Sequence, residues 1–307
     1  MTEPNNILHF LKKSTDFLEK KGIPNPRVDA EWLLSDLLNL TRIKLYAQFE
    51  TPLSDLETKQ YRERIVERGK RKPVAYITGK KGFHKFDFLV NEHTLIPRPE
   101  TEELVDYVYK NFKPIFKNQM DSNEDQVSNP TEDLNPYQIW DLCSGSGCIG
   151  LSLGKLLKDT NILLSDISDG AIEVSKQNAE RLGLTETCQF FVSDLDGQIP
   201  NDFQFDLVVS NPPYIPIEEK SSIMPDVVDF EPHSALFVGN FISFHEHLIQ
   251  ATKRRLKPGG KVLIETHPLH IHELEKIVLD LGFTDTKRLL DSSNKERFLL
   301  FSKPINS

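Results

Sequence analysis

The sequence predicts an α/β protein in which a small all-helical domain precedes a domain built on a mostly parallel β-sheet. Three observations support this fold class. Apolar residues in roughly the first seventy positions recur at helical spacing. From Ile139 to Glu265, short apolar runs alternate with amphipathic segments, as in strands followed by crossover helices. Small or polar residues stand where successive strands end, which is where open α/β sheets bind ligands.

Length and composition describe an ordinary globular protein of about two domains. The 307 residues are 38% hydrophobic and 27% charged, which is typical of soluble proteins. We expect no membrane segment, because no apolar stretch is long enough, and no secretory signal at the N-terminus. Cys143, Cys148 and Cys188 fit no disulfide or metal spacing, so we expect a reducing, cytoplasmic location.

The charge balance argues against general attachment to nucleic acid. The net charge is −9, whereas binding of the phosphate backbone needs a basic face. Two dense basic segments remain, and we interpret both as solvated helix faces. They contain Arg62, Arg64, Arg68, Lys70, Arg71 and Lys72 in one segment, and Lys253, Arg254, Arg255 and Lys257 in the other.

Helices account for the first part of the chain, which we predict to be a domain over residues 1–72. Ser54 followed by Glu57 is a capping-box pattern that opens a charged helix ending at Gly69. The domain has no cluster of chemical groups, so we interpret it as an interaction or packing unit. The predicted helices cover residues 7–20, 29–40, 41–49 and 54–69.

We predict a β-hairpin over residues 73–99 that links the two domains. Aromatic and β-branched residues, which are favoured in strands, are interrupted there by Gly79 and Gly82. The stretch Leu95-Ile96-Pro97-Arg98-Pro99-Glu100-Thr101-Glu102 follows. Its prolines predict an extended approach to a helix that begins at Glu100 or Thr101 and runs through Phe112. Residues 117–136 are polar and nearly free of apolar side chains, which predicts a disordered insertion without chemistry in the 100–307 domain.

A small-residue loop follows the first predicted strand of the sheet, Ile139–Leu142. It reads Asp141-Leu142-Cys143-Ser144-Gly145-Ser146-Gly147 and precedes a helix over Ile149–Leu157. Such a loop lets the backbone approach a nucleotide-like ligand closely. The second strand, Asn161–Ser165, ends in Asp166, whose carboxylate can accept hydrogen bonds from both hydroxyls of a ribose.

The third and fourth strands also end in groups suited to a ligand. A helix capped by Ser168 or Asp169 runs to Leu182, and the strand Gln189–Ser193 then ends in Asp194 and Leu195. This polar and apolar pair can hold an adenine amine and ring. Four such strand ends in succession predict one ligand crevice rather than a chance arrangement.

The fourth strand, Asp206–Ser210, stops at Asn211-Pro212-Pro213-Tyr214 because two prolines cannot continue a sheet ladder. The Asn211 side-chain oxygen and the Pro212 carbonyl can accept two hydrogen bonds, and the Tyr214 ring can pack on a flat group. The set therefore suits a planar group bearing NH2, such as an amide or a base amine. Taken alone, a proline pair is also common in ordinary turns without a functional role.

The remaining elements complete the sheet. A Pro/acid-rich loop runs from Tyr214 to about Leu236, and a turn at Lys257-Pro258-Gly259-Gly260 precedes a strand. His267, His270 and His272 lack a completing ligand, so we predict no metal site. The expected elements are helices over 241–256 and 269–281, a strand over 261–265, and a terminal antiparallel pair over 283–290 and 297–302.

These motifs together resemble class I S-adenosylmethionine-dependent methyltransferases, and more narrowly the HemK/PrmC family, the glutamine methyltransferases of peptide chain release factors. The resemblance extends from about residue 5 to nearly the end of the chain, and Leu95–Glu102 is its most selective piece. Asn-Pro-Pro-Tyr alone is shared with DNA adenine and ribosomal methyltransferases. The resemblance implies a Rossmann-like sheet of seven strands. We also expect a monomer, without stable nucleic-acid binding.

The resemblance also implies roles for individual residues. Cys143, Ser144, Gly145, Ser146 and Gly147 would surround the methionine part of S-adenosylmethionine. Asp166 would hold the ribose, and Asp194 and Leu195 would lie at the adenine. Asn211 would touch both cofactor and substrate, while Pro212, Pro213 and Tyr214 shape a slot for the glutamine of a Gly-Gly-Gln motif. The implied product is N(5)-methylglutamine, and the release factor is the implied partner.

The chain departs from the family pattern at three places. Cys143 stands where the family usually has glycine, and we expect this small side chain to be tolerated; 237–241 and 266–268 also differ. Two other functions remain as alternatives: a nucleic-acid adenine methyltransferase, which predicts a basic groove, and a non-catalytic binding protein that retains the fold.

Overall fold

A computed structural model of the chain describes residues 5–121 and 136–305, which form two compact units. One unit comprises the described part of Met1–Lys80 together with Ile223–Phe230. The other comprises the described part of Lys81–Ser222 and Glu231–Ser307. Within these described residues, no helix is both long and apolar enough to cross a lipid bilayer.

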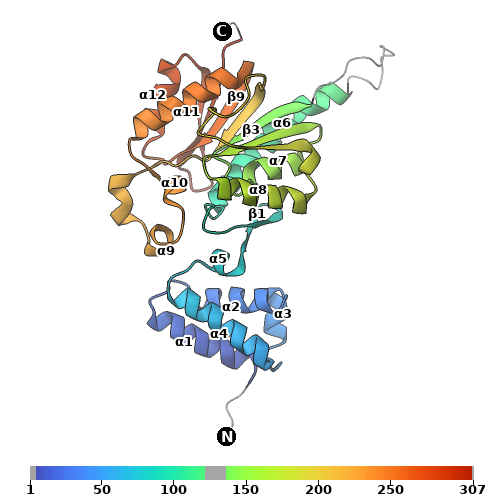
Figure 1. The fold of residues 1–307 in the computed structure, drawn as a ribbon, viewed down its shortest axis with the longest axis vertical. Helices are drawn as coiled ribbons and strands as arrows, with labels where there is room; N and C mark the ends of the chain where they lie inside the picture. The colour runs from blue at the N-terminus through green and yellow to red at the C-terminus, as the bar shows by residue number, and fades with distance from the viewer. Residues whose placement is uncertain (1–4, 122–135, 306–307) are drawn as a thin grey trace. The chain divides into compact units, whose positions relative to one another are not determined.

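The N-terminal unit is helical, as the sequence predicts, and its helices enclose a core of their own (Figure 1). Leu11, Leu33, Leu34 and Tyr61 are fully buried in it. The predicted capping box is present, because the Glu57 nitrogen bonds the Ser54 hydroxyl while the Glu57 carboxylate accepts from the Ser54 nitrogen. The helices are α1 (Ile7–Lys20), α2 (Pro26–Leu37), α3 (Arg42–Ala47), α4 (Asp55–Gly69) and α5 (Val74–Thr78).

A segment distant in sequence completes this helical unit. Ile223–Phe230 contains the short helix α9 (Pro225–Val228). Asp226 of this helix forms ion pairs with Arg68 at 2.7 Å and with Arg71 at 2.8 Å. Arg68 also pairs with Asp29 at 2.7 Å. A guanidinium with five donors can bridge two carboxylates in this way, so the segment is fastened to α2 and α4 through one buried cation.

The larger unit is built on a seven-stranded sheet in the order β10-β11-β9-β6-β3-β4-β5. The five strands from β9 to β5 in this order run parallel, and β11 and β10 are antiparallel additions at one edge. The strands are β3 (Tyr137–Leu142), β4 (Thr160–Asp166), β5 (Cys188–Val192), β6 (Phe205–Ser210), β9 (Leu256–Glu265), β10 (Thr284–Leu290) and β11 (Glu296–Ser302).

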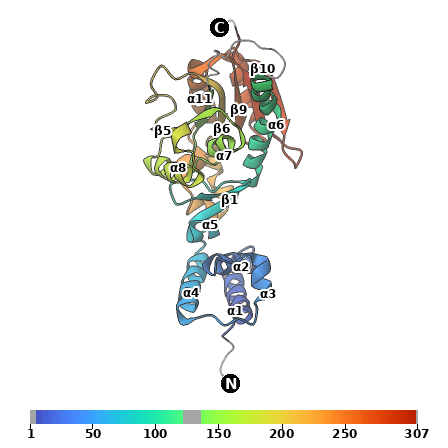
Figure 2. The same cartoon turned by 90° about the vertical axis from the view of Figure 1, so that its right-hand side faces the viewer.

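Helices cover both faces of this sheet (Figures 1 and 2). Leu207, Val209 and Leu263 face a core shared with α6, α7 and α8, whereas Val208 and Val262 face a core shared with α11 and α12. This period-two alternation with both faces apolar is expected of a parallel sheet buried between two helical layers. The helices are α6 (Pro99–Asp121), α7 (Cys148–Leu156), α8 (Asp169–Leu182), α11 (Phe241–Arg255) and α12 (Ile271–Asp280).

The strand order reverses between β3 and β6. From β3 the chain builds outward through β4 to β5, and then returns to place β6 on the other side of β3. The loops that leave β3 and β6 therefore diverge, which opens a crevice at their carboxyl ends. The predicted glycine-containing loop and Asn211 follow these two strands.

Several sequence predictions are corrected in detail. Residues 74–78, expected to belong to a hairpin, form α5, because Pro73 starts a short helix that Gly79 ends with φ of +73°. The paired strands are limited to β1 (Lys80–Phe83) and β2 (Phe86–Leu89). Helix α6 continues to Asp121, so the first residues of the 117–136 insertion are helical; 122–135 lie outside the described residues.

Two further segments are more regular than predicted. The expected turn at 257–260 is part of β9, where a register shift opposite Phe205–Leu207 absorbs the irregular backbone. The loop after Tyr214 contains short elements instead of open coil. These are β7 (Ile215–Pro216), a 3-10 helix (Ile217–Ser222), α9, α10 (His233–Leu236) and β8 (Phe237–Val238), with β7 and β8 paired in parallel.

Candidate active site

A cavity of about 270 Å³ lies at the carboxyl ends of the parallel strands of the larger unit. Its wall combines the loop after β3 with the ends of β4, β5 and β6, as the sequence predicts. The N-terminal turn of α6 and the region around α10 and β8 close the remaining sides. The chemically relevant lining residues are Arg98, Thr101, Cys143, Ser144, Gly145, Ser146, Asp166, Asp194, Leu195, Asn211 and Pro213.

The loop after β3 is held in a sharply folded conformation. Cys143, Gly145 and Gly147 have φ values of +60°, +54° and +76°, so alternate residues occupy the left-handed region. The Gly145 nitrogen donates to the Asp166 carboxylate at 2.9 Å, and the Ser175 hydroxyl donates to the Gly145 carbonyl at 2.8 Å. These two hydrogen bonds fasten Gly145 on both sides, to the end of β4 and to α8.

Asp166 stands at the end of β4 with both carboxylate oxygens engaged. One oxygen accepts from Gly145 and the other accepts from the Ser168 nitrogen at 3.0 Å. Burial raises the pKa of Asp166, and these backbone N–H groups partly counteract that effect because they stabilise the ionised carboxylate. The backbone nitrogen of Ile167 also stabilises this carboxylate, and one of its roughly four lone-pair sites can still accept from a ligand hydroxyl.

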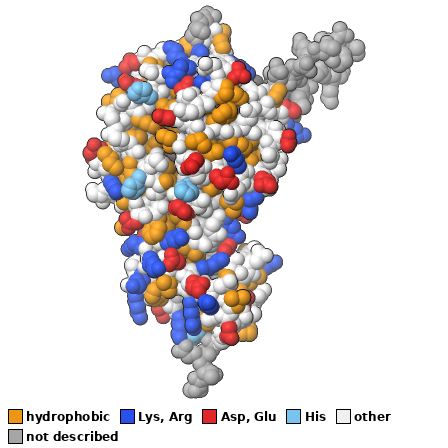
Figure 3. Space-filling view, viewed as in Figure 1, with side chains coloured by type: hydrophobic (Ala, Val, Ile, Leu, Met, Phe, Trp, Pro, Cys, Tyr) orange, Lys and Arg blue, Asp and Glu red, His pale blue; other side chains and the backbone are white. Residues whose placement is uncertain are grey.

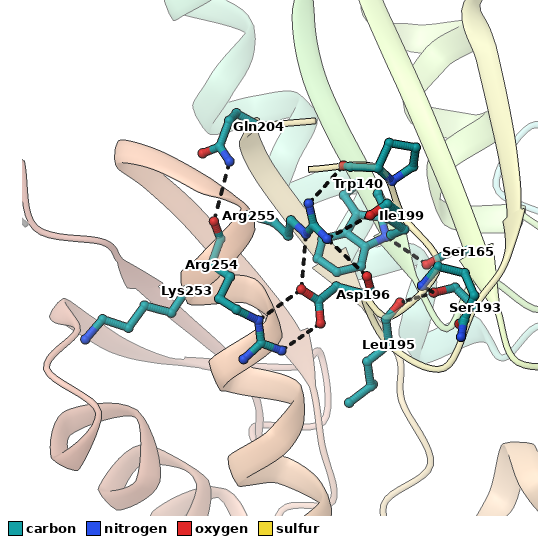
Figure 4. Close-up of polar contacts among 12 residues, drawn as sticks. Trp140, Ser165, Ser193, Leu195, Asp196, Ile199, Gln204, Lys253, Arg254 and Arg255 are labelled. Atoms are coloured by element: carbon teal, nitrogen blue, oxygen red, sulfur yellow. Dashed lines mark hydrogen bonds and ion pairs between the residues drawn. The ribbon is translucent and has the colours of Figure 1, made fainter. Parts of the chain in front are cut away.

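The residues after β5 are positioned by two arginines of α11. Figure 4 shows Asp196 between the guanidinium groups of Arg254 and Arg255, next to Leu195. Burial alone would raise the pKa of Asp196, but the two guanidinium groups lower it. Leu195 has φ of +51°, and its carbonyl accepts from the Ser193 hydroxyl at 2.9 Å. This network fixes Asp194 and Leu195 at the cavity wall.

The end of β6 meets the start of α6. The Asn211 side-chain nitrogen donates to the Thr101 hydroxyl at 3.1 Å, and that hydroxyl donates to Glu265 at 2.7 Å. Burial raises the pKa of Glu265 to about 7. The extended stretch before α6 is fixed separately, because buried Glu231 accepts from the Ile96 nitrogen at 3.1 Å and from Arg98 at 2.7 Å.

The structure brings most of the predicted site residues to this one cavity. Gly147, Pro212 and Tyr214 do not line it. Gly147 caps α7, and an added Cβ there would lie 2.9 Å from Leu164, so close packing leaves no room for a side chain at this position. Tyr214 lies near Glu265 and Arg297, and burial raises its pKa to about 12. The functional roles assigned to all these residues stay predictions.

Two polar site residues were not identified from the sequence. The sequence predicts Thr101 only as a possible helix start and Glu265 only as the end of a strand. The signal for Glu265 was present, since β9 is a fifth parallel strand with a polar residue at its carboxyl end. The contact between Thr101 and Glu265 joins residues 164 positions apart and depends on tertiary packing.

The three histidines near β9 have other partners. His270 contacts Glu273 at 3.1 Å, and His272 contacts Arg288 at 3.2 Å. Over the part of the chain that the structure describes, no group of three or more His, Cys, Asp or Glu side chains is arranged to hold a metal ion.

The two basic segments are largely occupied by internal contacts. In the helical unit, Arg64 pairs with Asp36 at 2.7 Å, and Arg68 and Arg71 pair with Asp226. In the larger unit, Lys257 pairs with Asp206 at 2.7 Å. Figure 3 shows acidic side chains interspersed with Lys and Arg on the face that it presents. The prediction of solvated helix faces is therefore only partly right, because Arg68 and Arg255 are buried and Lys257 lies on β9.

Comparisons with known proteins agree with this architecture. The family model described as PrmC N-terminal domain matches residues 9–79, and the one described as Methyltransferase small domain matches residues 127–229. The crystal structure of the hMettl16 catalytic domain in complex with MAT2A 3'UTR hairpin 6 has a TM-score of 0.53 and 13% identity, and the match covers 82% of each chain. At this identity the likeness concerns the fold.

Relatives of much higher identity extend over the whole chain. A release factor glutamine methyltransferase from Leptospira interrogans serogroup Icterohaemorrhagiae serovar Lai (strain 56601) is 46% identical over 304 residues, covering 99% of this chain and 100% of the relative. A second, from Rhodopirellula baltica (strain DSM 10527 / NCIMB 13988 / SH1), is 32% identical over 303 residues, covering 98% and 97%.

Proposed function

The chain belongs to the family of release factor glutamine methyltransferases, and we propose that it methylates the glutamine of the Gly-Gly-Gln motif in class I peptide chain release factors. The methyl group passes from S-adenosyl-L-methionine to the side-chain amide nitrogen, and the product is N(5)-methylglutamine. The enzyme then acts on translation termination, in the cytoplasm where its substrate works, and as a monomer. The observation that carries the proposal is the single cavity shared by Gly145, Asp166 and Asn211.

The cavity wall fits the chemical groups of the proposed cofactor. Bound there, S-adenosylmethionine would supply an electrophilic methyl group on a positively charged sulfur. The Cys143–Gly147 loop holds the methionine part, and an added Cβ on Gly145 would meet no protein atom within 4 Å. The Asp166 carboxylate accepts from the ribose hydroxyls, and Asp194 and Leu195 hold the adenine. Carboxylates around the cavity also favour a cation.

The substrate amide is held by Asn211 and the residues that follow it. The Asn211 side-chain oxygen and the Pro212 carbonyl accept the two N–H bonds of the glutamine amide, and Pro213 and Tyr214 shape the slot. These fixed dipoles orient the nitrogen and stabilise the positive charge that grows on it as the new bond forms. A strong base is unnecessary, because the proton can leave to water after the nitrogen is methylated.

We assign recognition of the release factor to the helical domain, residues 1–72, with the 73–99 segment as the connection to the 100–307 methyltransferase domain. None of the described residues of the helical unit lines the cavity, which favours a role in holding the protein substrate. Removing residues 1–72 should weaken release-factor affinity and leave cofactor affinity intact.

Mass spectrometry of a release factor after incubation with the protein and cofactor tests the function. We expect one methyl group on the Gly-Gly-Gln glutamine. The variant Asn211→Ala should lose about a hundredfold or more in single-turnover rate, as for loss of one oriented dipole. Asn111→Ala, on the exposed surface of α6, is the matched control. An Asn211→Ala variant with normal turnover contradicts the role of Asn211.

Two further experiments test the alternative functions, a nucleic-acid methyltransferase and a non-catalytic binding protein. Methylation of DNA or RNA in place of the release factor would identify a nucleic-acid methyltransferase. Calorimetry with S-adenosylmethionine addresses a non-catalytic protein that retains the fold, because a chain with a ruined cofactor loop does not bind the cofactor.

A further inference from the structure

Three polar groups form a hydrogen-bonded chain that runs from partly buried Asn211 through Thr101 to Glu265. The Asn211 side-chain nitrogen lies 3.1 Å from the Thr101 hydroxyl oxygen, which lies 2.7 Å from a Glu265 carboxylate oxygen. Thr101 is 2% exposed and Glu265 is 1% exposed, so water does not replace these contacts. Asn211 directly follows β6, Thr101 lies in the first turn of α6, and Glu265 ends β9.

The proton count along this chain allows one arrangement when Glu265 is ionised. A carboxylate has only acceptors, so the single hydroxyl proton of Thr101 must be donated to Glu265. The hydroxyl oxygen can then only accept from Asn211. The amide of Asn211 must therefore turn its NH2 group toward Thr101, which leaves its oxygen on the opposite side.

We propose that Thr101 and Glu265 are positioning residues that lock the Asn211 amide with its oxygen turned toward the substrate nitrogen. The inference rests on the proposed function, in which that oxygen accepts from the glutamine amide. The reverse orientation would present an NH2 group to another NH2 group, and no hydrogen bond could form between them. The two residues thus decide whether Asn211 can act at all, although neither contacts the reacting atoms.

The charge state of Glu265 depends on the groups around it. Burial raises its pKa to about 7, whereas the Thr101 hydroxyl, Arg297 and Arg98 favour the ionised form and Glu100 disfavours it. Arg297 is itself fixed by Asp291 at 2.8 Å, and Arg98 by Glu231 at 2.7 Å. Two further titratable groups interact with Glu265: burial raises the pKa of the Tyr214 phenol and of the Cys148 thiol, and the Glu265 carboxylate adds to both effects.

Protonation of Glu265 removes the constraint. A protonated carboxyl can donate to Thr101, whose own proton is then free to bond the Asn211 oxygen, so both amide orientations become possible. The productive orientation is enforced while Glu265 is ionised and is no longer enforced once Glu265 is protonated. We therefore expect the single-turnover rate to fall on acidification with an apparent pKa near 7, and Glu265→Gln to abolish this step.

Substitutions at Thr101 separate positioning from packing. Thr101→Val keeps the side-chain shape and removes the hydroxyl, and should lower the single-turnover rate on the order of tenfold to a hundredfold, with cofactor affinity retained. Thr101→Ser keeps the hydroxyl and should restore most of the rate. Thr252→Val, which removes a buried hydroxyl of α11 bonded only within its helix, is the control for lost stability.

The Asn211 amide itself gives a readout that does not need turnover. With ¹⁵N-labelled asparagine, the Asn211 side-chain signal should show hydrogen-exchange protection in the wild type, and Thr101→Val should abolish it. The inference is overturned if Thr101→Val keeps the wild-type rate, if Thr101→Ser is as slow as Thr101→Val, or if Glu265→Gln keeps the same pH step. The wild-type protein is assayed beside these variants. If it methylates the release factor while the variants behave in one of these ways, the positioning role is wrong and the proposed function still holds.

Discussion

The Asp166 carboxylate accepts a 2.9 Å hydrogen bond from the backbone nitrogen of Gly145. This contact joins the end of β4 to the loop after β3, and both residues line the cavity. A single carboxylate thus shapes the loop and also presents lone pairs to a ligand. The conformation of the loop after β3 therefore depends on the Asp166 carboxylate.

Replacing the Asp166 carboxylate should weaken cofactor binding for two reasons, because the carboxylate shapes the loop after β3 and also accepts hydrogen bonds from the ligand. Asp166→Asn keeps the size but converts one acceptor oxygen to NH2, so either Gly145, Ser168 or a ribose hydroxyl loses its partner. Hydrogen bonds to a charged group contribute about 1.5–3 kcal/mol, so S-adenosylmethionine affinity by calorimetry should fall about 10- to 100-fold. Asp169→Asn, on the exposed start of α8, is the control; undiminished affinity in Asp166→Asn would remove Asp166 from the site.

Gly145 offers a test that separates backbone strain from obstruction of the cavity. Gly145 and Gly183 both have positive φ, +54° and +67°, and at each an added Cβ meets no protein atom within 4 Å. Alanine at either position should destabilise by about 1 kcal/mol in urea unfolding. Only Gly145 lines the cavity, so only Gly145→Ala should also weaken cofactor binding, by about tenfold or more. Equal affinities in the two variants would place the methionine part elsewhere.

The sequence was most informative where short-range rules apply. The ends of four successive parallel strands could be located from apolar runs and the small, acidic or Pro residues that follow them, and the structure brings these ends to one cavity. The capping box at Ser54 and the Gly183 helix end are likewise local, so their residues suffice to predict them.

Features that depend on long-range packing were missed. No local pattern indicates that Asp226 pairs with Arg68 of the helical unit, or that Thr101 donates to Glu265, because each contact joins residues more than 150 positions apart. The short elements after Tyr214 were also missed. Their Pro and acidic residues have low intrinsic preference for regular structure, and tertiary contacts override that preference.

Cys143 occupies a left-handed backbone position where glycine would be unstrained, with φ of +60°. Cys143→Gly relieves strain of about 1–2 kcal/mol, and it also increases the entropy of the unfolded chain by a comparable amount. We expect the free energy of unfolding and the cofactor affinity to change little. Cys143→Val should destabilise by about 2 kcal/mol or more, because a β-branched residue fits this region poorly. If Cys143→Val and Cys143→Gly had the same free energy of unfolding, the loop would not hold this conformation in solution.

His245 should make the free energy of unfolding depend on pH between the pKa of this side chain in the folded protein and its pKa in the unfolded chain. The side chain is fully buried on α11, and its Nδ1 lies 2.8 Å from the Phe241 carbonyl. Burial, with a smaller effect of His270, lowers the pKa of His245 to about 4, whereas an unfolded histidine titrates near 6.5. The unfolded chain therefore binds a proton that the folded chain excludes, and stability falls as the pH drops from about 6.5 toward 4, by up to about 3 kcal/mol.

The variant His245→Phe isolates this contribution because it keeps a ring beside Phe241 and cannot ionise. Urea unfolding between pH 4 and 7 should show the variant gaining stability relative to the wild type as the pH falls. His247→Phe, the same exchange on the exposed side of α11, is the control and should follow the wild type. A constant difference between His245→Phe and the wild type across this range would mean that His245 becomes protonated without unfolding. In that case the core beneath α11 admits a charge that its apolar packing should exclude.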